Sequence, residues 1–145
     1  MTFTSSDVND QDYILTKISY VGFVDPYGME GVIILKTNEG KEFPMSAFSG
    51  EVASHIARFQ QGDRGSIPTI YNLIEEIAEM KEMLLGEVRI YQNGSVLRAN
   101  LHFKNRNDKL VLRNYRASDC IALAVYYNIP ILVRKNLFEK AAQEK

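Results

Sequence analysis

Three residues that lie close together in the sequence, Arg116, Ser118 and Asp119, have side chains suited to binding a phosphate group. A short helix is expected to begin here, and backbone N–H groups at a helix N-terminus favour anions. Arg116 would bind phosphate oxygens, while Asp119 would orient the guanidinium or hold a cation. The same residues also fit an ordinary helix start, in which Ser118 caps the helix and Arg116 pairs with Asp119. Both interpretations stay open at this point.

A second candidate is a stripe of basic side chains on one face of a predicted β-hairpin, whose strands span 96–103 and 109–115. With Phe103 opposite Leu110, the alternation of side chains separates a core side from an outer side. The core side holds Leu97, Ala99, Leu101, Phe103, Leu110 and Leu112. The outer side holds Arg98, Asn100, His102, Lys104, Lys109, Val111, Arg113 and Tyr115. The positive charge of this face predicts contact with nucleic-acid phosphates through Arg98, His102, Lys104, Lys109 and Arg113. A solvated sheet face, or an oligomer contact facing an acidic helix, is the alternative.

The remaining titratable residues give weaker patterns. His55 lies at the edge of an apolar helical stripe and is expected to be a partly buried packing residue. Cys120 precedes an apolar run, so we expect a small core residue and no nucleophile. Asp25 and Glu30 flank a glycine-containing loop, but two carboxylates five residues apart are a weak indication of a divalent cation.

The elements that position these residues follow from periodicity and turn signals. We expect strands at 13–24, 32–36, 42–47, 87–91, 96–103, 109–115 and 129–133, and helices at 49–62, 68–86, 117–128 and 136–145. The order β-β-β-α-α-β-β-β-α-β-α is typical of an α+β fold with a mostly antiparallel sheet. It contains two successive units of three strands and a helix, which suggests a weak internal duplication without a sequence repeat.

The two helices of the first half carry specific signals. Ser49 is a plausible cap of the first, which should end at Gly62 in a left-handed conformation. The second is expected to start near Pro68 and to end at Gly86. Its predicted buried face consists of Ile70, Leu73, Ile74, Ile77 and Leu84, and its opposite face is acidic, with Glu75, Glu76, Glu79 and Glu82.

Composition sets the broad class of the protein. The 145 residues are 46% hydrophobic and 24% charged with a net charge of −1, so any nucleic-acid surface must be local. The single cysteine excludes an internal disulfide and a cysteine-based zinc cage. Segment 1–11 has little apolar content and is predicted to be a flexible tail before one domain at 12–145. The N-terminal segment is acidic, and no apolar run approaches the roughly 18 residues of a membrane span. We therefore expect no membrane span and a cytoplasmic location.

Two blocks of this sequence resemble the bifunctional nuclease domain family. The segment RASDCIALAVYYNIPILV (116–133) is similar to its C-terminal signature, Arg-Pro-Ser-Asp-Ala followed by an apolar helix and a strand. The segment KEFPMSAFSGEVASHIARFQQG (41–62) resembles its other block, a Leu-Pro-Ile strand that enters a helix and ends at glycine. The resemblance covers roughly residues 13–141.

The resemblance implies an oligomeric α+β protein that cleaves RNA, DNA or both, with Mg²⁺ or Mn²⁺ admissible as a cofactor. The matching positions are Arg116, Ser118, Asp119 and Glu51, which it identifies as catalytic candidates. Four positions depart from the family pattern: Tyr71 and Asn72 replace His and Asp, Asn114 replaces Asp, and Ala117 replaces Pro. If the lost groups catalyse in the family, this chain is impaired, so a non-catalytic nucleic-acid-binding or assembly module is the alternative.

Overall fold

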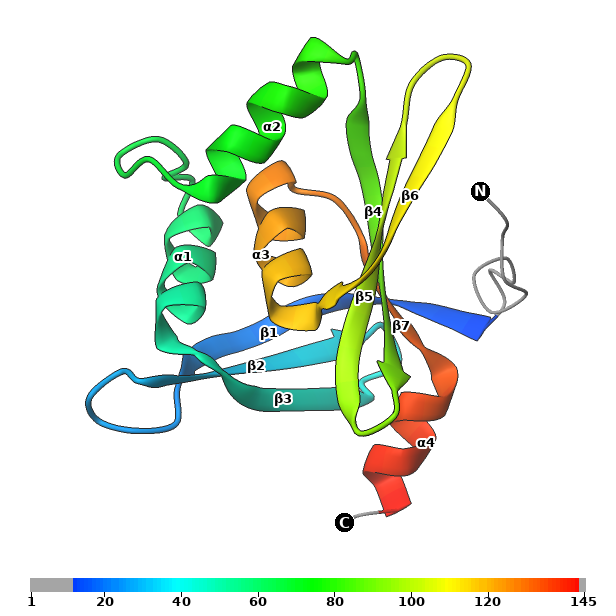
Figure 1. Ribbon diagram of the computed structural model, residues 1–145. Coiled ribbons are helices and arrows are strands. Elements are labelled where there is room, and N and C mark those ends of the chain that lie inside the picture. Colours follow the sequence, from blue (N-terminus) through cyan, green and yellow to red (C-terminus); the bar gives the residue numbers. More distant parts are fainter. Residues whose placement is uncertain (1–11, 144–145) are drawn as a thin grey trace.

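The computed structural model describes residues 12–143 and confirms the α+β class and the predicted order of elements. Its strands are β1 (Tyr13–Phe23), β2 (Glu30–Thr37), β3 (Glu42–Ser49), β4 (Leu84–Asn93), β5 (Val96–Lys104), β6 (Lys109–Arg116) and β7 (Ile131–Arg134). Its helices are α1 (Gly50–Gln60), α2 (Ile70–Met80), α3 (Ala117–Tyr127) and α4 (Lys135–Gln143). Figure 1 shows α1, α2 and α3 on the same side of the strands. The predicted flexible tail at 1–11 lies outside the described residues.

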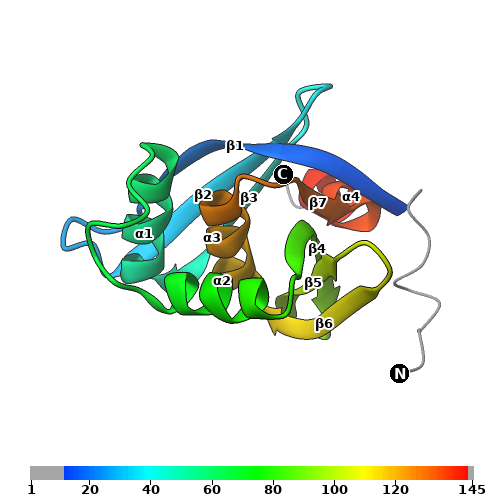
Figure 2. The ribbon, with the colours of Figure 1, turned by 90° about the horizontal axis from the view of Figure 1, so that it is seen from above.

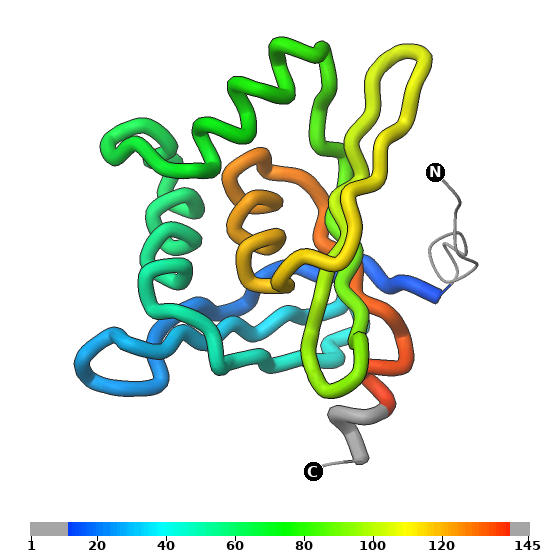
Figure 3. The backbone as a smooth tube through the Cα atoms, viewed as in Figure 1, coloured from blue at the N-terminus to red at the C-terminus, as the bar shows by residue number. Residues whose placement is uncertain are grey.

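The described strands form one sheet in the order β3-β2-β1-β7-β4-β5-β6. Each half is an antiparallel meander of consecutive strands, because short hairpin connections bring neighbours in sequence together. β7 joins the halves, antiparallel to β1 and parallel to β4. Each meander leads directly into a helix, β3 into α1 and β6 into α3, as the chain path in Figure 3 shows. This arrangement agrees with the two predicted units of three strands and a helix.

The core lies between the sheet and the two helices that follow the meanders. α1 packs on β1, β2 and β3, while α3 packs on α1 and on β4, β5 and β6. Ile33, Ile56, Ile90 and Ile121 are completely buried in this core. Burying such a side chain contributes about 1.5–3 kcal/mol to stability, so these contacts hold α1 and α3 side by side.

Helix α2 differs from its prediction in both bounds and orientation. Thr69 caps it in a capping box with Asn72, so the helix begins two residues after Pro68. It ends at Met80, and Glu82 adopts a left-handed conformation with φ 56°. The predicted buried face is mostly wrong: Tyr71 and Ala78 are the residues of this helix that are buried, and of the predicted face Ile74 is partly buried against the core. The apolar side chains Ile70, Leu73, Ile77 and Leu84 are 51–64% exposed, Leu84 being part of β4. The helix lies at the margin of the fold (Figure 2), and the buried residues Tyr71 and Ala78 mark one narrow arc of its surface.

The hairpin of β5 and β6 confirms the predicted pairing of Phe103 with Leu110. Two details differ. Leu110 is 41% and Leu112 is 36% exposed, because β6 is an edge strand. The pairing also shifts between Ala99 and Leu101, next to Asn114 with φ 69°, so Tyr115 pairs with Ala99. This bulge moves Tyr115 from the predicted outer face to the core side.

No helix within residues 12–143 has the length and apolar character needed to cross a membrane.

Candidate functional site

The site is built where the two parallel helices α1 and α3 begin. Ser49 and Arg116, the last residues of β3 and β6, are the N-caps and have nearly the same backbone angles, φ −62°, ψ 136° and φ −60°, ψ 133°. The helices pack on each other, and both start at the lower end in Figure 1. A helix N-terminus carries about half a positive charge. Two of them at one end of the molecule favour an anion there.

Arg116 and Asp119 form the predicted pair at the start of α3. The Nε atom of Arg116 donates a hydrogen bond to Oδ2 of Asp119 over 2.8 Å, which raises the pKa of the guanidinium. The Arg116 side chain nevertheless remains 70% exposed, and that of Asp119 36% exposed. The pair therefore orients the guanidinium while leaving it open to solvent, where it can meet a phosphate.

Ser118 does not cap this helix, so that prediction is wrong. The N-cap is Arg116, and no side chain makes a capping hydrogen bond to α3. The helix starts directly at the end of β6, which places Ser118 inside the first turn and buries it to 6% exposure. A buried hydroxyl in this position cannot attack a phosphate in solvent.

Tyr71 reaches this cluster from α2, although it is distant in sequence. Its side chain is 5% exposed, and burial is the main cause that raises its pKa to about 12. The charges of Asp119 and Glu51 raise the pKa further, while that of Arg116 lowers it, so the phenol lies within electrostatic range of these groups. The hydroxyl consequently stays protonated at neutral pH.

Glu51 and His55 complete the cluster on α1. Ser49 accepts a hydrogen bond from the N–H of Glu51, whose carboxylate is 80% exposed. Nε2 of His55 lies 3.4 Å from Oε1 of Glu51, and Nδ1 lies 2.6 Å from Nη2 of Arg58. Because a guanidinium only donates, Nδ1 accepts and the proton of a neutral His55 is on Nε2, directed at Glu51.

His55 fits the predicted partly buried packing residue, since its side chain is 16% exposed and its ring stacks on Phe59. Its ring also contacts that of Tyr71, with ring centroids 5.7 Å apart, and no local signal predicts this contact. We call Glu51, His55, Tyr71, Arg116 and Asp119 the Arg116 cluster.

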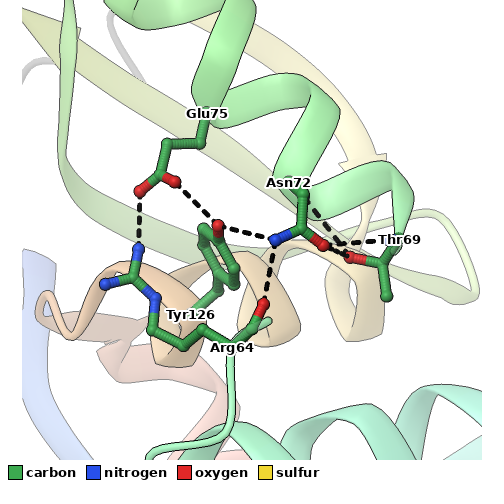
Figure 4. A network of polar contacts seen from close by, with 5 residues as sticks. All are labelled: Arg64, Thr69, Asn72, Glu75 and Tyr126. Atoms are coloured by element: carbon green, nitrogen blue, oxygen red, sulfur yellow. Dashed lines mark hydrogen bonds and ion pairs between the residues drawn. The ribbon is translucent and has the colours of Figure 1, made fainter. Parts of the chain in front are cut away.

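Asn72 does not belong to the Arg116 cluster, although it follows Tyr71. Its Oδ1 accepts hydrogen bonds from the backbone N–H and the hydroxyl of Thr69, and its Nδ2 donates to the Arg64 carbonyl and to the Tyr126 hydroxyl. Tyr126 in turn donates to Glu75 over 2.7 Å (Figure 4). Asn72 is therefore a structural residue that ties the start of α2 to α3.

The predicted basic face is exposed only in part. Lys104 and Lys109 are exposed, whereas Arg98 and His102 are half-buried. The guanidinium nitrogens of Arg113 are buried. The positive stripe available to a nucleic acid is thus narrower than the alternation of side chains predicted.

Other candidates have structural explanations. The Asp25 carboxylate accepts hydrogen bonds from the N–H groups of Tyr27, Met29 and Glu30, which lowers its pKa and organises the loop between β1 and β2. Cys120 is buried, and this raises the pKa of its thiol to about 12, in agreement with a core residue. Within residues 12–143, no three His, Cys, Asp or Glu side chains come together in a metal-binding group.

A cavity of about 850 Å³ lies away from the Arg116 cluster, where α1 and α3 end. Its lining includes Leu15, Lys17, Phe59, Arg64 and Ile129. The C-terminal ends of two helices carry partial negative charge, and the basic lining residues Lys17 and Arg64 oppose that charge.

Comparison with known proteins adds one finding. The family model described as "bifunctional nuclease domain" matches residues 33–145, which include every member of the Arg116 cluster. The search of curated proteins found no match.

Proposed function

The chain belongs to the bifunctional nuclease domain family, and from that premise we propose that it binds the phosphodiester backbone of RNA or DNA at the Arg116 cluster and hydrolyses it there. One observation carries the proposal: the Arg116 guanidinium is 70% exposed while Asp119 holds it at the shared N-terminal end of α1 and α3. A phosphate at this position would receive a charge-assisted hydrogen bond and the field of two helix N-termini.

Hydrolysis needs charge neutralisation, a base for the attacking water and a proton for the leaving oxygen. Arg116 supplies the first as the transition state gains negative charge. Glu51 is the exposed carboxylate that accepts the proton of water, and the Nε2 proton of His55 orients it. The leaving oxygen takes its proton from solvent, to which Glu51 releases the proton that it accepted, and Asp119 positions Arg116.

A divalent metal is not given a step in this scheme. The cluster offers the carboxylates of Glu51 and Asp119, and Asp119 already accepts a hydrogen bond from Arg116. This donor set is too small for a site held by the protein alone, so Mg²⁺ or Mn²⁺ would need phosphate oxygens as further ligands. The expectation of a metal stays a prediction for the cleavage experiment.

A second candidate function is binding without cleavage. It is favoured by Tyr71, which stands at the family His position: a phenol with a pKa of about 12 cannot accept a proton at neutral pH. The family Asp position is occupied by Asn72, which is engaged with Thr69, Arg64 and Tyr126. In this second function, the Arg116 cluster binds phosphate without cleaving the nucleic acid.

The test is a cleavage assay with end-labelled single- and double-stranded RNA and DNA, in Mg²⁺, in Mn²⁺ and in chelator. We expect the wild-type chain to cleave, Arg116→Ala to lose at least 100-fold in rate, and the surface control Lys41→Ala to match the wild type. Binding of the same substrates is measured in parallel by fluorescence anisotropy.

The outcomes separate the two functions. Cleavage that is equal in the wild type, Arg116→Ala and Asp119→Ala would indicate a contaminant and overturn the enzymatic proposal. Binding that depends on Arg116 without any cleavage would establish the second function. Binding that does not depend on Arg116 would overturn both.

A further inference from the structure

The end of β1 and the loop that leads to β2 present large apolar side chains to solvent. Four of them are exposed: Phe23 44%, Val24 58%, Tyr27 86% and Met29 75%. Exposed apolar residues that occur singly are common on protein surfaces, whereas a group of them on one short segment indicates a contact site. We call residues 23–29 the Tyr27 loop.

Hydrogen bonds hold the Tyr27 loop in one conformation. The Asp25 carboxylate accepts from the backbone N–H groups of Tyr27 and Met29, over 3.0 and 2.9 Å. The N–H of Val24 donates to the carbonyl of Glu30 over 2.9 Å, which closes the loop at its base. A side chain on an ordered backbone loses less entropy when it binds a ligand than one on a mobile segment. Tyr27 is therefore prepared for a contact.

The Tyr27 loop lies beside the Arg116 cluster. The N–H of Gly50, the first residue of α1, donates to the Met29 carbonyl over 3.0 Å. The next residue, Glu51, belongs to the cluster, and α3, which begins after Arg116, packs on α1. In Figure 1 the loop is at the lower left, at the end of the molecule where both helices start. A nucleic-acid strand that is bound at Arg116 and passes Glu51 meets the Tyr27 loop next.

An unpaired nucleobase is the ligand that suits this loop. Residues 23–30 include two carboxylates and no lysine or arginine, so the loop offers no cation to a phosphate or to an anionic lipid surface. A nucleobase is uncharged, and its flat face stacks on a tyrosine ring whatever its sequence. Bases of a double helix are already stacked on one another, so a single strand is the form that can present a base to Tyr27.

We propose that Tyr27 stacks on an unpaired base of a strand whose phosphate lies at Arg116. The Arg116 cluster then binds single-stranded RNA or DNA in preference to a duplex. This inference rests on the proposed function, because it requires a strand at Arg116. It adds a contact to the base, which the Arg116 cluster itself does not supply.

Tryptophan fluorescence tests the stacking directly. The chain contains no tryptophan, so Tyr27→Trp introduces a single reporter in the loop. A short single-stranded oligonucleotide should quench its emission, and a duplex of the same sequence should not. The matched control is Tyr20→Trp: Tyr20 is 51% exposed and pairs with Ile34, whose neighbours Ile33 and Leu35 point into the core, so it lies on the opposite face of the sheet. Its emission should stay unchanged.

Binding measured by fluorescence anisotropy separates this inference from the proposed function. Arg116→Ala should weaken the binding of both the single strand and the duplex. Tyr27→Ala should weaken the binding of the single strand about tenfold, the effect of one lost base–aromatic stack, and leave that of the duplex unchanged. Circular dichroism and thermal melting establish that the variants are folded.

Each outcome decides one of the two. Binding that depends on Arg116, with no quenching in Tyr27→Trp and full single-strand affinity in Tyr27→Ala, overturns the inference and leaves the proposed function standing. Binding that does not depend on Arg116 overturns the proposed function, and the inference with it. An equal loss of single-strand and duplex binding in Tyr27→Ala overturns the unpaired base as the ligand. So does a blue shift of Tyr27→Trp on phosphatidylcholine vesicles without quenching by the oligonucleotide, which would assign the loop to a lipid surface.

Discussion

Replacing Asn72 by alanine should destabilise the protein without touching the Arg116 cluster. The substitution removes the capping-box partner of Thr69, which is worth about 1 kcal/mol in unfolding free energy. It also removes the half-buried hydrogen bond between Nδ2 and the Tyr126 hydroxyl, at 3.0 Å, worth about another 1 kcal/mol. A loss of about 2 kcal/mol lowers the melting temperature of a chain of this length by about 6 °C.

The assay is a thermal or urea melt followed by circular dichroism, with nucleic-acid binding measured on the same samples below the transition. Asn72→Asp is the informative companion, because a carboxylate still accepts from Thr69 but cannot donate to Arg64 and Tyr126. It should recover about half of the lost stability. Unchanged stability in Asn72→Ala, or a selective loss of binding in a fully stable variant, would refute the structural role assigned to this residue.

Three further predictions concern the scaffold. Gly50→Ala places a Cβ on the carbonyl oxygen of Gly28 and should lower the unfolding free energy, measured with denaturant, by at least about 3 kcal/mol. The control Gly40→Ala, where a Cβ meets nothing within 4 Å, should lower it far less despite the positive φ of that residue. The folded-state pKa of Tyr71 lies above its ordinary value of 10, so the contribution of Tyr71 to stability is complete below pH 10 and is lost as the pH rises toward 12. Tyr71→Phe should therefore flatten the curve of unfolding free energy against pH in this alkaline range. A curve that is the same for the variant and the wild type would contradict this prediction. Cys120 should react with iodoacetamide at pH 7.5 only in denaturant, and labelling of the native protein would show that the thiol is accessible.

Local signals in the sequence were sufficient for the helix that supports much of the site. Helix α1 has a capping serine, an apolar stripe that proves to be buried, and Gly62 with φ 88° just after its end. All of these signals act within a few residues. The pairing of Arg116 with Asp119 is equally local, because residues three apart share a helix face.

Features that depend on distant segments were not predictable in the same way. Helix α2 has more than one apolar arc, and periodicity alone does not say which arc meets the core. The bulge near Asn114 changes the face of Tyr115, and a single-residue shift of this kind leaves no pattern in the strand. Tyr71 approaches Arg116 because α2 packs on α3, and the two residues are 45 positions apart in the chain. The cluster therefore could not be predicted from local signals in the sequence.

The central claim is that Arg116 contacts a phosphate of bound nucleic acid. The most direct measurement is the salt dependence of binding to a single-stranded oligonucleotide, for the wild type, Arg116→Ala and the exposed control Lys41→Ala. Loss of one phosphate contact should reduce the slope of log K against log salt by about 0.7 in Arg116→Ala, with an unchanged slope in the control. The exposed ion pair with Asp119 contributes at most about 1 kcal/mol, so stability should change little. Equal affinity and equal slope for the wild type and Arg116→Ala would contradict the account.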